Sequence, residues 1–262
     1  MAPETSFRTD HLTFSYPGKP RNEVIHDLSV ELPKGKIITL IGANGCGKTT
    51  LLNLLTGSLK PDSGTVYLGG ENSAQIGRKE YAKRVAIVHQ HNTAPPDVTV
   101  ERLVSFGRTP YTKVGFPEDK EADREKIRWA LEVTQMTPLK NCPVSSLSGG
   151  QKQRAWIALA LAQGTDMLLL DEPTTYLDIR YQLDILRLVR KLNEEFGLTI
   201  IMVLHDINQS LAYSDEIVAM RRGRIVAQGT PAEVITTDLL KNVYDIDLQL
   251  VSVEGAPFIL PV

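Results

Sequence analysis

The chain has 262 residues, 42% of them hydrophobic and 23% charged, so it can bury a core but is too short for several large domains. Its 29 basic and 31 acidic residues give a formal charge of -2, which argues against a nucleic-acid surface based on net positive charge. The two cysteines make no disulfide framework, and no run reaches the roughly 20 apolar residues that cross a bilayer. The first nine residues have neither the basic start nor the apolar stretch of a secretory signal. We therefore expect one globular, cytosolic unit whose membrane role, if any, is peripheral.

The first third of the sequence carries four stretches with strand patterns. Apolar and polar residues alternate from Leu12 to Leu32, which predicts half-buried antiparallel strands. The run from Lys36 to Ile41 is apolar on both faces, as in a strand buried in a mostly parallel sheet. A turn at Asp62 to Gly64 precedes a strand from Thr65 to Leu68, and Val85 to Val88 is a further buried strand.

The rest of the chain alternates helices with strands. No strong strand signal lies between residues 97 and 163, and apolar residues at helical spacing from Glu118 to Met136 predict a helical insert. Alternation of this kind predicts an α/β core with a mainly parallel sheet. A short tail follows the last strand. The elements expected here are helices at Gln151 to Gln163 and Ile179 to Phe196, and strands at Met167 to Leu170, Thr199 to Leu204, Glu216 to Met220 and Arg224 to Ala227.

A glycine-rich loop separates the buried strand at Lys36 to Ile41 from a helix that carries four leucines. The glycines let backbone N–H groups converge on one point, and the helix start adds its positive end, so the loop can cradle phosphates. Lys48 would reach the outer phosphates, and the Thr49 hydroxyl would bind Mg²⁺. The nucleotide-binding residues predicted in this loop are Gly42, Asn44, Gly45, Cys46, Gly47, Lys48, Thr49 and Thr50.

The loop has two other possible interpretations. A plain strand-to-helix turn would need neither the lysine nor the hydroxyl at these offsets, so we reject it. Cys46 could be a redox switch, since a helix start can lower a thiol pKa, but a small residue tolerated in the loop is favoured.

Two carboxylates follow the apolar run Met167 to Leu170. The carboxyl ends of parallel strands meet at one sheet edge, so Asp171 and Glu172 should lie near the phosphate loop. Asp171 is the expected Mg²⁺ partner. Because adjacent strand residues point to opposite sides, Glu172 can instead polarise water as a general base. Alone, such a pair could simply begin a loop and cap a helix.

Two further strands end in polar residues. His205 follows Thr199 to Leu204 and could contact the γ-phosphate or orient Glu172, while Asp206 has capping-box spacing to Gln209. Gln90 follows Val85 to Val88, where it could touch Mg²⁺ or the attacking water. His89 and His91 flank Gln90, but two histidines are weak evidence for a metal site.

The segment Leu147-Ser148-Gly149-Gly150-Gln151 indicates which class of nucleotide-binding protein this is. Ser148 and Gln151 have capping-box spacing, and the two glycines leave backbone amides open to an anion, so this is a second phosphate-binding helix start. A plain capped helix would not need both glycines. The segment resembles the signature of ATP-binding cassette proteins, and the resemblance covers nearly the whole chain.

This resemblance implies a fold and a set of roles. The fold is a P-loop NTPase (RecA-like) α/β core with an N-terminal antiparallel β subdomain and a helical insert. Its approximate parts are a nucleotide-binding core with the antiparallel part at residues 1–96, a helical signature subdomain at 97–163, and the second part of the core with a short tail at 164–262. ATP and Mg²⁺ would lie between the phosphate loop of one copy and Ser148 to Gln151 of another, in a head-to-tail dimer.

The family motif assigns further residues by position. Tyr16 is where an aromatic ring stacks on adenine, although a strand aromatic packed in the core is the plainer alternative. Gln90 matches the glutamine loop and a Mg²⁺ ligand, and His205 matches the switch histidine. Asp178 fits the loop that crosses the dimer interface. Tyr176 departs from the small residue commonest there, so the packing of that interface stays open.

Several stretches look like the ATPases of iron–siderophore, haem and vitamin B12 importers. They are Ser105 to Tyr111, Trp156, Thr174 to Asp178 with Gln182, and Leu204 to Gln209. The first would meet a membrane permease, unless it is an ordinary surface loop. The implied protein energises siderophore uptake at the cytoplasmic face of the membrane, through a permease and, indirectly, an external binding protein, without nucleic acid.

Other classes stay open at this point. Import of haem, vitamin B12 or metal is the nearest alternative, followed by an exporter subunit or a non-transport cassette protein. A phosphate-loop kinase would share Lys48 and Thr49 but would have no use for Ser148 to Gln151.

Overall fold

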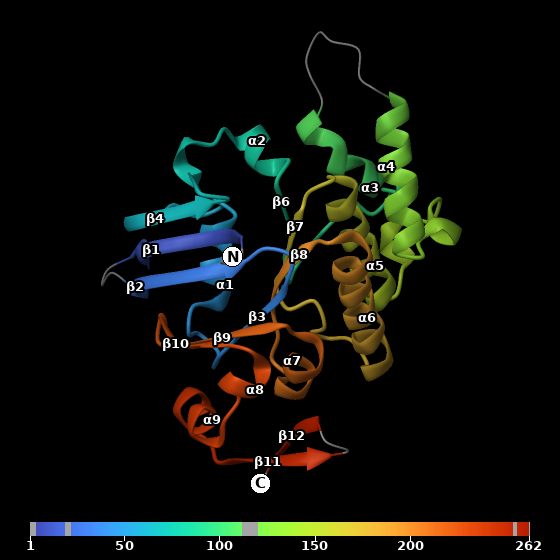
Figure 1. Ribbon diagram of the computed structural model, residues 1–262. Coiled ribbons are helices and arrows are strands. Elements are labelled where there is room, and N and C mark those ends of the chain that lie inside the picture. Colours follow the sequence, from blue (N-terminus) through green and yellow to red (C-terminus); the bar gives the residue numbers. More distant parts are fainter. Residues whose placement is uncertain (1–3, 19–21, 112–119, 254–255, 262) are drawn as a thin grey trace. The chain divides into compact units, whose positions relative to one another are not determined.

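The computed structural model (Figure 1) describes residues 4–18, 22–111, 120–253 and 256–261. The chain divides into two compact units. The first unit comprises Met1–Ile76 and Thr199–Val262, and the second comprises Gly77–Leu198.

An antiparallel sheet opens the first unit. Its strands are β1 (Thr5–Tyr16), β2 (Asn22–Pro33), β4 (Ser63–Leu68) and β5 (Glu71–Asn72), in the order β2-β1-β4-β5, followed by the 3-10 turn η1 (Ser73–Gln75). The alternation predicted between Leu12 and Leu32 is confirmed, because Leu28, Val30 and Leu32 are buried while Ser29 and Glu31 are exposed. The strand expected at Thr65 begins two residues earlier.

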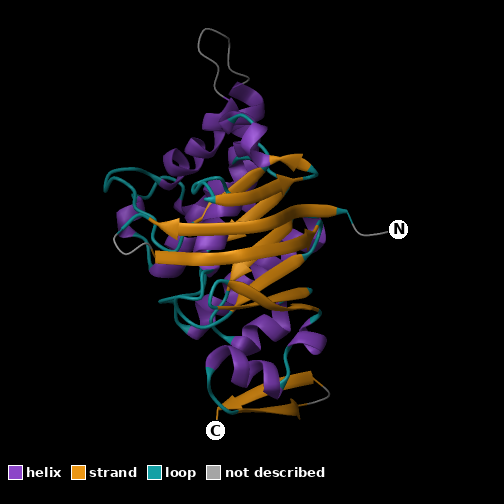
Figure 2. Cartoon of the chain, turned by 90° about the vertical axis from the view of Figure 1, so that its left-hand side faces the viewer, coloured by secondary structure: helices purple, strands orange, loops and turns teal. Residues whose placement is uncertain are grey.

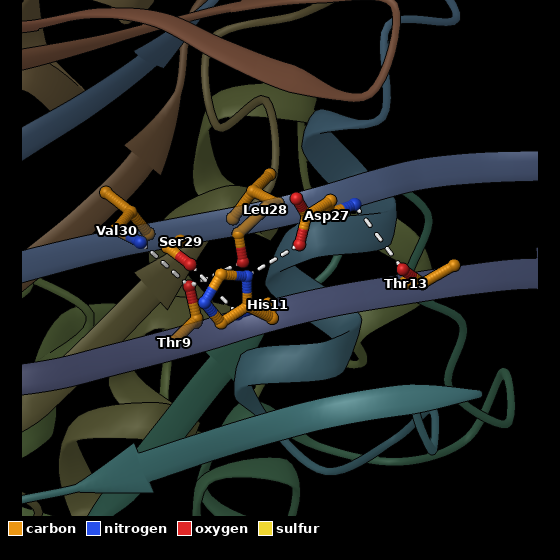
Figure 3. Close-up of polar contacts among 7 residues, drawn as sticks. All are labelled: Thr9, His11, Thr13, Asp27, Leu28, Ser29 and Val30. Carbon is orange, nitrogen blue, oxygen red and sulfur yellow. Dashed lines mark hydrogen bonds and ion pairs between the residues drawn. The ribbon is translucent and has the colours of Figure 1, made fainter.

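Two bulges face each other across β1 and β2 (Figure 3). His11 and Asp27 both have left-handed backbone, with φ of 50°, and their side chains are joined by a hydrogen bond of 2.7 Å between Nδ1 and Oδ1. The His11 N–H donates to Ser29 Oγ at 2.8 Å, and the Val30 N–H donates to Thr9 Oγ1 at 3.0 Å. The hydroxyl groups of Ser29 and Thr9 thus accept hydrogen bonds from backbone N–H groups that lack a carbonyl partner where the bulges interrupt the pairing of the two strands. This allows both strands to bend.

A second sheet of the first unit carries the buried strands β3 (Ile37–Ile41), β8 (Thr199–Val203) and β9 (Glu216–Arg221), with β10 (Arg224–Gly229) at its edge. β3 runs parallel to both β8 and β9, while β10 is antiparallel to β9. Every residue of β3 and β8 is buried, as the two-sided apolar pattern predicts. Helices α1 (Lys48–Leu55) and α7 (Ile207–Tyr213) follow β3 and β8.

The expected short tail is structured. It contains α8 (Pro231–Val234), α9 (Thr237–Tyr244) and a hairpin of β11 (Leu248–Val253) with β12 (Ala256–Pro261), which Figure 2 shows beside these helices at the C-terminal end. Val234, Leu240 and Ile259 are buried with Ile41 in one hydrophobic cluster. The tail is therefore packed against the strand that leads into the phosphate loop.

The second unit holds two parallel strands and most of the helices. The strands are β6 (Val85–Val88) and β7 (Met167–Leu170), both at their predicted bounds. The helical stretch expected from Glu118 is α4, and residues 118 and 119 lie outside the described residues. The helices are α2 (Arg78–Ala82), α3 (Val100–Ser105), α4 (Lys120–Val133), α5 (Gly149–Ala162) and α6 (Ile179–Phe196), with 3-10 turns η2 (Phe106–Tyr111), η3 (Thr137–Leu139) and η4 (Val144–Ser146).

Across the described ranges, no helix is both long enough and apolar enough to pass through a membrane.

Candidate functional site

The phosphate loop joins β3 to α1 through glycines that no other residue could replace without strain. Gly42 has φ of 148°, and a Cβ there would lie 2.3 Å from the carbonyl oxygen of Met220. Gly47 has φ of 107°, and a Cβ there would lie 2.9 Å from Ile25 Cδ1. Gly45, with φ of 77°, faces open space. Backbone thus packs tightly behind the loop and leaves its outer face accessible.

The ammonium group of Lys48 lies inside this loop. The residue is 6% exposed, and its Nζ donates to the carbonyl oxygens of Gly42 at 2.7 Å and Ala43 at 3.2 Å. Asn44 and Thr49 are exposed, whereas Thr50 is buried. A buried cation at a helix start, with exposed backbone and hydroxyl groups around it, fits a chain of phosphates.

Cys46 is a packed residue of the loop. It is 4% exposed, and burial raises the pKa of its thiol, although the nearby charge of Lys48 acts in the opposite direction. A raised pKa lowers the thiolate fraction, so this environment supports the interpretation of a small residue over that of a redox switch.

Tyr16 lies at the end of β1 beside the loop. Its hydroxyl is 3.3 Å from Thr50 Oγ1, and its ring meets that of Phe14 edge to face, with centroids 5.0 Å apart. The residue is 38% exposed, so the ring is not enclosed in the core. It presents an aromatic surface next to the start of α1.

His205 follows β8, the parallel neighbour of β3. It is exposed and precedes Asp206, whose Oδ1 accepts from the Gln209 N–H at 3.0 Å at the start of α7. The helix start expected at Asp206 is confirmed. Because β3 and β8 are parallel, His205 lies at the same sheet edge as the phosphate loop.

The acidic pair of the second unit follows β7 as expected, but it lies in a turn. Asp171 is 3% exposed, and its N–H donates to the carbonyl oxygen of Val88 at 2.9 Å. Glu172 has left-handed backbone with φ of 51°. The expectation that strand alternation separates the two carboxylates is therefore wrong, because a turn sets the direction of Glu172.

Two donors hold the Glu172 carboxylate. Gln90 Nε2 donates to Glu172 Oε2 at 2.5 Å, and Thr175 Oγ1 donates to the same oxygen at 3.0 Å. The structure thus brings together Gln90 and Glu172, two residues that were each predicted for the site but not predicted to touch. Because the amide nitrogen of Gln90 faces this carboxylate, its oxygen is the atom that can bind a cation.

Tyr176 stands in the next position of the turn with unusual exposure. It has φ of 63°, is 85% exposed, and stacks on the ring of His91 with centroids 6.3 Å apart.

Within the described part of the chain, no three His, Cys, Asp or Glu side chains gather around a possible metal position, at His89 and His91 or elsewhere.

The signature segment starts α5 with the predicted capping box. Ser148 Oγ accepts from the Gln151 N–H at 3.4 Å, and Gln151 Oε1 accepts from the Ser148 N–H at 3.0 Å. Gly149 is exposed, but Gly150 is buried, and a Cβ on Gly150 would lie 2.6 Å from the ring of Tyr181. The second glycine is thus required by packing inside the unit as well as by any anion.

Asp178 is the N-cap residue of α6. Its Oδ1 accepts from the Tyr181 N–H at 3.2 Å and caps the start of α6. The role at a dimer interface stays a prediction.

The Ser105 to Tyr111 stretch ends α3 and forms η2, which packs on the C-terminal end of α5. Arg108, with a side chain 12% exposed, donates from Nε to Asp123 Oδ1 at 2.6 Å and from Nη1 to the Ala162 carbonyl oxygen at 2.8 Å. The Tyr111 ring lies 3.8 Å from its guanidinium carbon. Inward-facing residues thus anchor the motif, while Phe106 remains 42% exposed.

The predicted site residues fall into two groups, one in each unit. The first unit holds Tyr16, the phosphate loop and His205, and the second holds Gln90, the signature segment, Asp171, Glu172 and Asp178. Two contact residues were missed. Thr175 had only its place in the turn as a signal, and Tyr244, whose hydroxyl accepts from the Gly42 N–H at 3.1 Å, had none.

Comparisons with known proteins agree with this arrangement. A family model described as ABC transporter matches residues 25–175. The iron(3+)-hydroxamate import ATP-binding protein FhuC of Bacillus subtilis (strain 168) is 46% identical over 94% of this chain and 90% of its own length. The ferric enterobactin transport ATP-binding protein FepC of Escherichia coli (strain K12) is 43% identical over 97% of this chain and 93% of its own.

A solved structure supports the fold independently. The dimeric, post-hydrolysis ATP-binding cassette MJ0796, bound to ADP and Pi, matches with a TM-score of 0.74 and 27% identity over 86% of this chain and 98% of that one. The family match includes the phosphate loop, the signature segment and the acidic pair. The chain therefore belongs to the ATP-binding cassette transporter family, whose members of this kind are ATPases that bind ATP and drive transport.

Proposed function

We propose that this protein is the ATP-hydrolysing subunit of an importer for iron–siderophore complexes. The observation that carries the hydrolytic part is the Glu172 carboxylate held by Gln90 and Thr175, in a chain that also has a phosphate loop with a buried lysine. The cargo is proposed from similarity to the hydroxamate and enterobactin proteins, whose names state their substrates.

The first unit binds the nucleotide in this proposal. The phosphate loop and Lys48 hold the phosphates, the Tyr16 ring stacks on the adenine, and His205 contacts the γ-phosphate. The donors expected for Mg²⁺ are the Thr49 hydroxyl, the Asp171 carboxylate and the Gln90 amide oxygen. These are hard oxygen ligands of the type that Mg²⁺ takes, and the ion, when bound, neutralises charge on the phosphate oxygens.

The second unit supplies the base and the signature. Glu172 accepts a proton from the water that attacks the γ-phosphate, and its two hydrogen-bond donors fix the orientation of the carboxylate. Ser148 to Gln151 offers the open end of α5 to ATP held by a second copy of the chain, in a head-to-tail dimer. Asp178 lies in the segment that crosses between the copies.

The dimer works on a permease at the cytoplasmic face of the membrane, and an external binding protein delivers the cargo to that permease. ATP binding closes the two subunits and hydrolysis reopens them. The region from Gln90 to Tyr111 passes this motion to the permease, which is consistent with the exposure of Phe106.

The first test replaces the base. Glu172→Gln should bind ATP within about twofold of the wild-type protein but hydrolyse it at least about 100-fold more slowly, and should accumulate as an ATP-bound dimer in gel filtration. Glu125→Gln, the same chemical change at an exposed position of α4, should behave as wild type. Rapid turnover by Glu172→Gln, or phosphate transfer to an added acceptor, would contradict the assignment.

The second test identifies the cargo. The tagged protein should be purified with its permease from the membranes of its source and reconstituted in vesicles with ATP inside and the binding protein outside. Uptake of a ferric siderophore that stops in Glu172→Gln vesicles is the expected result. Uptake of haem or cobalamin in its place would retain the ATPase and reject the proposed cargo.

A further inference from the structure

A tyrosine at the end of α9 contacts the first residue of the phosphate loop. Tyr244 ends α9, and its hydroxyl oxygen accepts a hydrogen bond from the Gly42 N–H at 3.1 Å, although the two residues are 202 positions apart. Burial raises the pKa of Tyr244 to about 12, so the hydroxyl stays neutral at physiological pH.

Gly42 is held at both of its polar groups. Its carbonyl oxygen accepts from Lys48 Nζ at 2.7 Å, while its N–H donates to Tyr244. The close approach of Met220 behind it leaves no room for movement in that direction. The junction between β3 and the loop is thus fixed by two side chains, one of which is the lysine that serves the phosphates.

Tyr244 is a firm support because α9 is anchored. Leu240 and Val243 are 0% and 2% exposed and share a hydrophobic cluster with Ile41, the last residue of β3. Arg221, at the end of β9, forms an ion pair with Asp245 of 3.0 Å just beyond the helix. The helix therefore carries its tyrosine at a fixed position relative to the loop.

We infer that Tyr244 is a positioning residue for nucleotide binding. This inference rests on the proposed function, in which the phosphate loop holds ATP. Without the hydroxyl, the buried Gly42 N–H loses its hydrogen-bond acceptor. The peptide can then turn so that this N–H bonds to another acceptor, and such orientations compete with the one that binds nucleotide. A smaller fraction of the molecules has a loop that can bind nucleotide, and the apparent dissociation constant for the nucleotide rises in inverse proportion to that fraction.

The test is Tyr244→Phe, which removes one oxygen and keeps the ring. ADP binding, measured by isothermal titration calorimetry, should weaken by about 3- to 10-fold. The KM for ATP should rise by the same factor, while kcat at saturating ATP stays within about twofold. Hydrogen exchange at the Gly42 amide should accelerate. Tyr67→Phe is the matched control, since Tyr67 lies on β4, where its ring stacks with Arg8, and this variant should bind ADP as wild type does.

Three results would overturn the inference. One is unchanged ADP affinity and KM in Tyr244→Phe. Another is a fall in kcat and melting temperature with KM unchanged, which would mark a residue that serves stability alone. The third is failure of the wild-type protein to bind ADP, which would reject the proposed function and this inference together.

Discussion

Gln90 and Glu172 lie 82 positions apart in the chain, yet a hydrogen bond of 2.5 Å joins the amide nitrogen of the first to the carboxylate of the second. Thr175 donates to the same carboxylate oxygen at 3.0 Å. One oxygen thus receives both donors, so the two side chains act on the proposed base as a unit.

This shared oxygen makes the effects of Gln90→Ala and Thr175→Val non-additive. Each variant should lower kcat by about tenfold, and the double variant should fall by less than the product, with a coupling of roughly 0.5–3 kcal/mol. Single-turnover ATPase rates measure this cycle. Thr137→Val, at an exposed position, is the control and should be neutral. Strictly additive losses would show that the donors act independently.

Lys48 should not tolerate replacement by arginine. Its ammonium lies at 2.7 Å and 3.2 Å from two loop carbonyl oxygens, a position that suits a compact cation and not a planar fork. Lys48→Ala and Lys48→Arg should both weaken ATP binding by about 10- to 100-fold in titration calorimetry. Lys60→Arg, an exposed lysine beyond α1, should have no effect. Full binding by Lys48→Arg would contradict this geometry.

The two glycines of the signature should differ in their effect on stability. Gly150→Ala should lower the free energy of unfolding by about 1–3 kcal/mol, because its methyl group would meet the Tyr181 ring. Gly149→Ala should change that free energy by less than about 1 kcal/mol, since its neighbour at 3.2 Å is the flexible end of Leu177. Chemical denaturation measures both. Adding Tyr181→Ala to Gly150→Ala should recover part of the loss, and no recovery would point to another cause.

Arg108 should contribute strongly to the stability of the second unit. Arg108→Ala leaves Asp123 without its partner and exposes the end of α5, so the free energy of unfolding should fall by about 3 kcal/mol. Arg108→Lys should recover only part, because one ammonium cannot reproduce two bonds and the stacking on Tyr111. Urea denaturation followed by circular dichroism measures the series. Equal stability of Arg108→Lys and wild type would contradict it.

Cys46 should react slowly in the folded protein. Burial raises the pKa of its thiol, so at pH 8 less of it is thiolate than in an exposed cysteine. N-ethylmaleimide should therefore modify the half-buried Cys142 at least about tenfold faster than Cys46, as measured by peptide mass spectrometry. In denaturant the two rates should converge. Fast labelling of Cys46 in the native protein would indicate a loop that opens readily.

The parts of the fold that local sequence patterns specify were predicted well. The helix from Ile179 to Phe196 has its expected bounds because Asp178 caps one end and Gly197, with φ of 67°, ends the other. The capping box at Ser148 and the strand, loop and helix around Lys48 depend in the same way on residues close together in sequence. Family resemblance added the roles that such patterns do not carry.

Contacts between distant segments could not be predicted from one sequence. The left-handed backbone of Glu172 sets the contact with Gln90, and nothing in the residue type indicates it. The elements after Gly229 are short, so their periodicity is too brief to recognise. Tyr244 consequently lay in a stretch for which only a short tail was expected, with no helix or strand assigned.

The bond between Gly42 and Tyr244 also orders events during synthesis. Ribosomes add roughly 5–20 residues per second, so the 202 positions between the two correspond to about 10–40 seconds of translation. During that interval the loop has been synthesised, while α9 has not yet been made. A nascent chain therefore cannot form this bond before α9 has been made, and the Gly42 N–H lacks the Tyr244 acceptor until then.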